Sequence, residues 1–160
     1  MPTSHSAPQR RKGRARRFES QGTPHREVYL LTQHVSGALN LELAAALKPY
    51  GVTPEQYHVL RILEDAAPGG LPCSTVGARA VSGDPDVTRL LDRLERQGWA
   101  SRSRNKTDRR VVMAAITRQG LQLLDKLEKQ VAALHARQLD SLGARELVRL
   151  RQLLERLGAR

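Results

Sequence analysis

The chain has 160 residues, which is enough for one ordinary domain with a hydrophobic core but not for two. Its formal net charge of +11 and its pI of about 11.0 indicate a polyanionic partner. No stretch approaches the roughly 20 apolar residues of a membrane span, and a single cysteine, Cys73, excludes an internal disulfide and suits a reducing cytosol.

The first 24 residues are a basic segment with six Arg or Lys residues against one acidic residue and almost no apolar content. We expect this segment to be disordered in isolation. It has no apolar stretch behind its basic residues, so we do not expect a secretory signal. Two interpretations stay open: an arm that follows a nucleic-acid backbone or enters a minor groove, and a solvated tail that adds only nonspecific attraction.

Two helices are predicted next. A first long helix spans about residues 26–47, and the Lys-Pro-Tyr-Gly sequence at 48–51 ends it. Its apolar face is marked at helical spacing by Val28, Leu31, Val35, Leu39, Leu43 and Leu47. Thr53 and Gln56 then predict a capping box with Pro54 at the first helical position, and they open a second helix.

A helix-turn-helix pair follows a loop at residues 67–70. A short helix over 74–81 is joined by Ser82 and Gly83 to a helix that Asp84 can cap and Gly98 can end. The apolar stripe of this later helix is Val87, Leu90, Leu91 and Leu94. The residues outside the stripe are Thr88, Arg89, Asp92, Arg93 and Arg96. A helix with this polar and cationic face can lie in a major groove with its N-terminal end toward the base edges.

A two-stranded ribbon is predicted directly after this helix. Residues 99–103 and 111–116 have strand length, and the loop between them, 104–110, consists of turn-forming and charged residues. Arginine suits the negative potential of a narrow minor groove, and Asp108 can stiffen the loop by holding a guanidinium in a bidentate pair. A solvated surface hairpin is the alternative, but the position after a recognition-type helix favours a winged helix-turn-helix.

Two more amphipathic helices complete the chain. Thr117 can cap the fifth helix, whose stripe is Leu121, Leu124, Leu127, Val131 and Leu134. After a break at Leu142 and Gly143, a sixth helix carries Leu147, Leu150, Leu154 and Leu157. The fold class is therefore mainly α with a small β-wing (α+β). The stripes at 28–47 and 121–157 flank the wing module, and we expect a two-fold interchain helical interface in preference to an ordinary intrachain core.

The residues that carry a family resemblance are VTRLLDRLE, a following Gly, then DRR, then a hydrophobic strand ending in Thr with a Gly three residues on. This pattern resembles the MarR family of bacterial transcription regulators, from about Glu27 to the C-terminus. With the reading above, the organisation is a disordered basic arm at 1–24 and a MarR-like domain at 25–160. The winged-helix core spans about 53–117, between dimerisation helices at about 26–47 and 118–157.

The resemblance implies a DNA-binding set of residues. In the family, the helix that carries VTRL enters the major groove, and the wing Asp and Arg, here Asp108 and Arg110, position and insert the wing. The DNA-facing positions at the helix start fall on Asp84, Asp86, Thr88 and Arg89, where the acidic residues are caps or acceptors for a cytosine amino group. Three basic residues complete the set: Arg93, Lys106 and Arg109.

The resemblance also implies a small aromatic or phenolic anion as effector, in a cleft between the dimerisation helices and the DNA-binding lobe. The residues expected near that cleft are His34, Tyr57, His58 and Arg61, with a core or surface role as the competing interpretation. Cys73 is expected to be structural. The five histidines lack metal-ligand spacing, and no nucleophile, base and orienting acid can be paired, so we expect no metal, no cofactor and no enzyme activity.

These observations predict a homodimeric, cytoplasmic, nucleoid-associated regulator of transcription that binds a pseudo-palindromic operator on double-stranded DNA. Its half-sites are expected about one helical turn apart. We expect a repressor that a small molecule releases. An architectural DNA-binding protein without sequence preference is the main alternative, which the basic arm favours. A vestigial regulator whose helical dimer serves protein contacts is a third interpretation.

Overall fold

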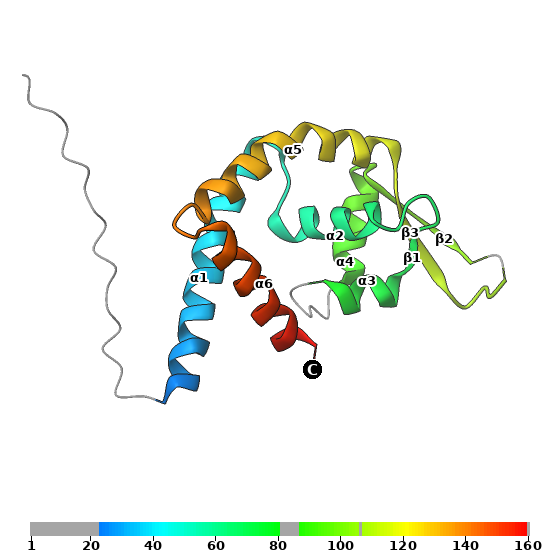
Figure 1. Cartoon of the computed structure of the whole chain (residues 1–160). Helices are drawn as coiled ribbons and strands as arrows, with labels where there is room; N and C mark the ends of the chain where they lie inside the picture. Colours follow the sequence, from blue (N-terminus) through cyan, green and yellow to red (C-terminus); the bar gives the residue numbers. More distant parts are fainter. Residues whose placement is uncertain (1–22, 81–86, 106, 160) are drawn as a thin grey trace, which may run out of the picture. The chain divides into compact units, whose positions relative to one another are not determined.

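The computed structural model describes residues 23–80, 87–105 and 107–159. The chain divides into two units, residues 1–35 and 36–160. The helices are α1 (Pro24–Leu47), a short 3-10 helix (Lys48–Tyr50), α2 (Pro54–Glu64), α3 (Cys73–Arg79), α4 (Val87–Arg96), α5 (Arg118–Gln138) and α6 (Ala144–Gly158). The strands are β1 (Leu71–Pro72), β2 (Ala100–Arg104) and β3 (Val112–Ile116) (Figure 1).

The predicted first helix is confirmed as α1. The division between the two units falls within it, so each unit contains one part of α1. In the first unit its large apolar side chains, Val28 and Leu31 among them, are exposed. In the second unit Leu43 and Leu47 are buried. The last turns of α1 are also fastened to α5, because the amide of Gln138 donates to the carbonyl of Leu39 at 3.1 Å.

The core of the second unit is an aliphatic cluster to which α1, α2, α4 and α5 contribute. The largest fully buried side chains are Leu47, Leu60, Leu63, Leu91, Leu94, Leu124 and Leu127. The predicted capping box of α2 is present: Thr53 Oγ1 accepts from the Gln56 amide at 3.2 Å, and Gln56 Oε1 accepts from the Thr53 amide at 3.0 Å. Local capping and a shared apolar core therefore agree in placing α2.

The sheet has three strands in the order β1-β3-β2, all antiparallel, and not the two that the sequence predicted. The extra strand, β1, pairs Leu71 with Ala114 and Pro72 with Met113. It was missed because two residues are too few to show an alternating pattern, and because proline is tolerated in a sheet only at an edge such as this one. The long pair, β2 with β3, forms the predicted ribbon, here called the wing (residues 100–116).

The two last helices differ in how they use their apolar residues. The α5 stripe of Leu124, Leu127, Val131 and Leu134 is buried in the chain's own core. No residue of α6 is buried, although α6 carries the predicted leucines. The expectation of an interchain interface in preference to an intrachain core is therefore wrong for the α5 stripe, and for α6 it stays a prediction.

Candidate nucleic-acid interface

The helix α4 presents one apolar and one polar face. Leu90, Leu91 and Leu94 are buried, as the stripe predicted, and they fix the helix on the core. Thr88, Arg89, Arg93 and Arg96 are exposed on the other side. Two of the three arginines lie in the last turn, where a cation is favoured by the helix dipole. The exposed face is therefore available for a polyanion.

The end of α4 is tied closely to the start of α5. Gly98 has φ = +73°, the left-handed conformation that the sequence predicted, and the Trp99 amide donates back to the Leu94 carbonyl at 2.9 Å. Thr117 Oγ1 donates to the Gly98 carbonyl at 2.6 Å and accepts from the Gly120 amide at 3.1 Å. A Cβ at Gly120 would collide with the Trp99 carbonyl. The Thr-x-x-Gly pattern thus fastens α5 to the turn that leads from α4 into the wing.

The wing tip is closed by one asparagine side chain. Asn105 Oδ1 accepts from the Thr107 amide at 2.8 Å, the Thr107 hydroxyl at 2.7 Å and the Asp108 amide at 3.3 Å. The Asn105 amide in turn donates to the Val111 carbonyl at 2.9 Å. Such side-chain turns hold a loop without a hydrophobic core. The tip therefore has a defined shape in which Arg109 and Arg110 are both exposed.

Asp108 has a different role from the one predicted for it. Its Oδ1 accepts from the backbone amide of Arg110 at 2.9 Å, where we expected a bidentate pair with a guanidinium. The correction has a simple reason: an aspartate reaches the amide two residues later within its own turn, without ordering a long arginine side chain. The carboxylate therefore stiffens the backbone of the wing, and the Arg110 side chain is exposed to solvent.

The base of the wing is linked to α4 by Arg102, a residue that the sequence analysis did not single out. Arg102 Nη2 lies 2.6 Å from Asp92 Oδ1 and 2.7 Å from Glu95 Oε2. A second polar link joins α2 to the residue that follows α4, because Nε2 of the buried Gln56 side chain donates to Gln97 Oε1 at 3.0 Å. Spacing alone offered little signal for either link, since each depends on where the chain turns after α4.

The predicted DNA-binding residues are brought together in part. Thr88, Arg89 and Arg93 share the exposed side of α4, and Asp108, Arg109 and Arg110 share the wing tip. Asp84, Asp86 and Lys106 lie outside the described residues. The wing is drawn beside the C-terminal end of α4 and extends beyond the helices (Figure 1). A polar helix face and a basic hairpin thus emerge from one rigid turn.

The predicted effector residues are less coherent. Tyr57, His58 and Arg61 lie on α2, whereas His34 belongs to the first unit. Arg61 Nη1 is held by Glu64 Oε2 at 3.0 Å and by Glu128 Oε2 at 3.1 Å. Burial raises the pKa of Tyr57 and lowers the pKa of His58, so both favour their neutral forms. A cationic site for an anion on α2 would therefore first have to displace two carboxylates.

The remaining chemistry of the chain is modest. Burial raises the pKa of the Cys73 thiol, which lies at the start of α3, and a protonated thiol suits the structural role expected for it. Among the described residues, no three His, Cys, Asp or Glu side chains gather as metal ligands would. None of the described helices has both the length and the apolar character needed to traverse a bilayer.

Comparison with protein families gives one match, to the MarR family model, over residues 52–112. Among curated proteins, the chain is 24% identical to the HTH-type transcriptional regulator MhqR of Bacillus subtilis, covering 82% of this chain and 90% of that protein. It is 30% identical to the HTH-type transcriptional repressor Rv2887 of Mycobacterium tuberculosis, covering 82% and 92%.

Solved structures give the same result. A MarR transcription factor from Planctomyces limnophilus is 34% identical with a TM-score of 0.64, over 84% of this chain and 97% of that chain. A mutant MarR from E. coli, solved in complex with operator DNA, is 26% identical with a TM-score of 0.73, over 86% and 99%. Both likenesses cover a larger share of the chain than the segment that the family model matches.

Proposed function

Because this chain belongs to the MarR family of helix-turn-helix transcriptional regulators, we propose that it binds double-stranded DNA in a sequence-dependent manner and represses transcription. The observation that carries the proposal is the joint exposure of Arg89 and Arg93 on α4 and of Arg109 and Arg110 on the wing, held around one turn. The named likeness to a protein solved on operator DNA supports it.

The two elements suit two parts of a duplex. The exposed side of α4 has the width and polarity to read base edges in a major groove, with Thr88 and Arg89 nearest its N-terminal end. The wing tip carries guanidinium groups of the kind that a narrow minor groove attracts. Asp84, Asp86 and Lys106 remain part of the proposed contact set on sequence grounds.

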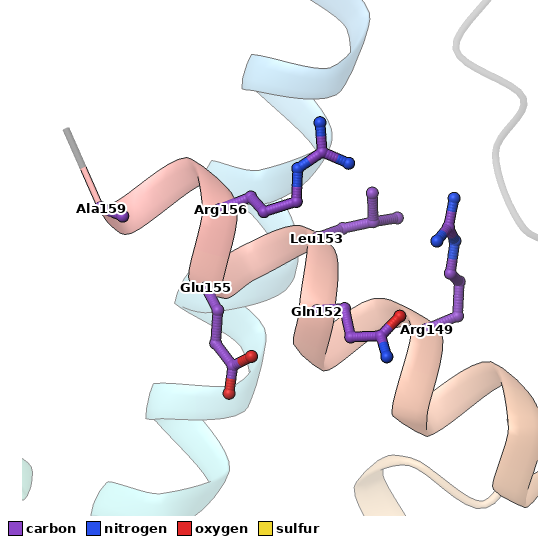
Figure 2. A pocket seen from close by; sticks show the side chains of 6 residues that line it. All are labelled: Arg149, Gln152, Leu153, Glu155, Arg156 and Ala159. Carbon is purple, nitrogen blue, oxygen red and sulfur yellow. The ribbon is translucent and has the colours of Figure 1, made fainter.

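We propose a homodimer as the active form, with α6 in its interface. Its exposed large side chains are Val148, Leu150, Leu153, Leu154 and Leu157, at exposed fractions of 38–53%. Arg149, Leu153 and Arg156 line a shallow pocket on α6 and extend to one side, whereas Glu155 points to the other (Figure 2). A helix whose apolar side chains stay exposed among the described residues suits a two-fold contact with a second copy. Such a dimer would require a pseudo-palindromic operator.

Release by a small aromatic or phenolic ligand, and a cytoplasmic, nucleoid-associated location, complete the proposal. His58 is half-buried on α2 and Tyr57 beside it is buried in the core, and burial favours the neutral form of both, so a ring that packs against this part of α2 is a better fit than a bare anion. A ligand that contacts α2 would act on α4 through the hydrogen bond between Gln56 and Gln97. Adding candidate phenols to the protein–DNA complex and measuring the apparent Kd tests this part.

The main experiment is selection of bound duplexes from a random pool by the full chain at physiological salt. A two-fold symmetric consensus is the expected result. Binding without any consensus would favour the architectural alternative, to which the net charge of +11 contributes. No binding at all would contradict the proposal.

The variant Arg110→Ala then tests the wing on the selected duplex. We expect a loss of about 1–3 kcal/mol in binding, the usual range for a specific DNA contact. The matched control is Lys126→Ala, which removes one exposed charge from α5, far along the chain from α4 and the wing. Equal losses for both variants would mean that only net charge matters.

A further inference from the structure

Arg102 is held by four polar contacts to two carboxylates. Its Nε donates to Glu95 Oε2 at 2.9 Å, its Nη2 donates to the same oxygen at 2.7 Å, and Nη2 also lies 2.6 Å from Asp92 Oδ1. Its backbone amide donates to Glu95 Oε1 at 3.1 Å. One residue of β2 thus grips two carboxylates of α4.

The path of the chain after α4 explains why Arg102 can reach both carboxylates. Asp92 and Glu95 are three residues apart and lie on the same side of the last turns of α4. The chain then reverses at Gly98 and runs back as β2, which brings Arg102 alongside them. The planar guanidinium can bridge both carboxylates at once, which the point charge of a lysine does less well.

The cluster differs from the other arginines of the interface in exposure and in charge. The side chain of Arg102 is only 28% exposed, whereas Arg104, Arg109 and Arg110 are exposed. Its hydrogen bond to Glu95 lowers the pKa of that carboxyl and so keeps it ionised. Two carboxylates around one guanidinium carry a net charge of −1, which is unfavourable for a phosphate contact.

We propose that Arg102 is a positioning residue that fixes the wing at a set angle to α4, so that both reach DNA in one arrangement. The inference rests on the proposed DNA-binding function. It assigns Asp92 and Glu95 to the same task, and it explains two acidic residues in the helix that the proposal places on DNA. Arg102 itself does not contact the duplex.

The test is a double-mutant cycle between Arg102→Met and Arg110→Ala, read on the duplex that the wild-type chain selects from the random pool. Should no consensus emerge, a mixed-sequence duplex replaces it. We expect Arg102→Met to weaken binding about tenfold. In the Arg110→Ala background the same change should weaken binding little further, because the DNA contact that depends on the position of the wing is already absent.

Salt dependence separates positioning from direct contact. A residue that neutralises a phosphate lowers the slope of log K against log salt by about 0.9 when it is removed. We expect Arg102→Met to leave the slope as it is in the wild type. Arg102→Lys, which keeps the charge but not the fork, should recover only part of the affinity. Thermal unfolding monitors the fold, and Asp92→Asn, which removes one arm of the grip, replaces Arg102→Met if that variant does not fold.

The outcomes are distinguishable. Unchanged affinity, or a lowered slope with fully additive effects, would overturn the positioning role while leaving DNA binding in place. Failure of the proposed function itself has another signature, in which neither the wild type nor Arg110→Ala shows specific binding. Weaker binding with an unchanged slope and non-additive effects would support the inference.

Discussion

The helices α5 and α6 follow one another and are both rich in leucine, yet α5 buries its apolar side chains and α6 leaves them exposed. The α5 stripe is buried in one core cluster with side chains of α1 and α2, so its apolar surface stabilises the fold of the single chain. In α6, Leu150, Leu153, Leu154 and Leu157 are 38–53% exposed, and no residue of this helix is buried by the part of the chain that the structure describes. Amphipathic spacing therefore predicts that a helix face will be buried, but not whether its own chain or another copy will cover it.

The strongest test of this comparison is Leu127→Ala in α5. The side chain is fully buried, so its removal leaves a cavity and should lower the free energy of unfolding by about 2–5 kcal/mol. Urea denaturation at fixed protein concentration measures it. A loss below about 1 kcal/mol would mean that the α5 stripe is less well packed than its burial indicates.

The counterpart in α6 is Leu154→Ala. Because Leu154 is half exposed and would pack against the second copy in the proposed dimer, we expect the variant to weaken dimer association by about 1–3 kcal/mol. Sedimentation velocity over a dilution series measures the shift. Leu127→Ala and Leu154→Ala serve as controls for each other, since one should change folding and the other assembly. If Leu154→Ala leaves the dimer intact, α6 is not the interface.

The first turns of the two helices sharpen the contrast. Thr117→Val removes the hydroxyl that bonds both Gly98 and Gly120, and we expect about 1–2 kcal/mol of lost stability. The comparison is Glu146→Ala in α6, where Glu146 Oε2 accepts from the Gly143 amide at 2.8 Å on an exposed helix. Its effect on thermal unfolding should be smaller. Equal shifts in Tm would show that α6 is folded on its own chain as firmly as α5.

The smallest expected effect is on the pH dependence of stability. It arises in the core that α5 shares with α2, because α6 contains no histidine. Burial lowers the pKa of His58, on α2, below its ordinary value of 6.5. Between the lowered pKa and 6.5 the unfolded chain binds more protons, so this group's stability contribution is complete above pH 6.5 and falls with pH below it.

His58→Gln should therefore flatten the rise of Tm with pH across that window. His25→Gln, in exposed α1, is the control for loss of an imidazole. An unchanged profile in His58→Gln would show that the imidazole titrates alike in both states. Thermal scans at closely spaced pH values below and above 6.5 provide the measurement.

Local signals in the sequence were sufficient for much of this structure. Capping by Thr53 and Thr117, the reversal at Gly98 and the buried stripe of α4 each depend on residues within about two helical turns of each other, and each was predicted. The two-residue strand β1 was not, because its only signature is a partner more than forty residues away. The assignment of α5 to the core was missed for the same reason.

The candidate site divides in the same way. The exposed arginines of the wing follow from composition, whereas the grip of Arg102 on Asp92 and Glu95 depends on how a helix end, a glycine reversal and a strand meet in space. For Asp108 the sequence predicted the role but not the partner. Its stiffening role was expected, but the partner is a backbone amide, which no pattern of side-chain charges reveals.

The asparagine-centred wing tip has a consequence for how such a chain changes over time. Its bend is maintained by the Asn105 and Asp108 carbonyl and carboxyl oxygens, and none of those bonds involves a guanidinium. The arginines can therefore be exchanged one at a time while the hairpin keeps its shape. Retuning the preference for one groove width or one base composition then needs only single substitutions, and a drift in target does not endanger the fold.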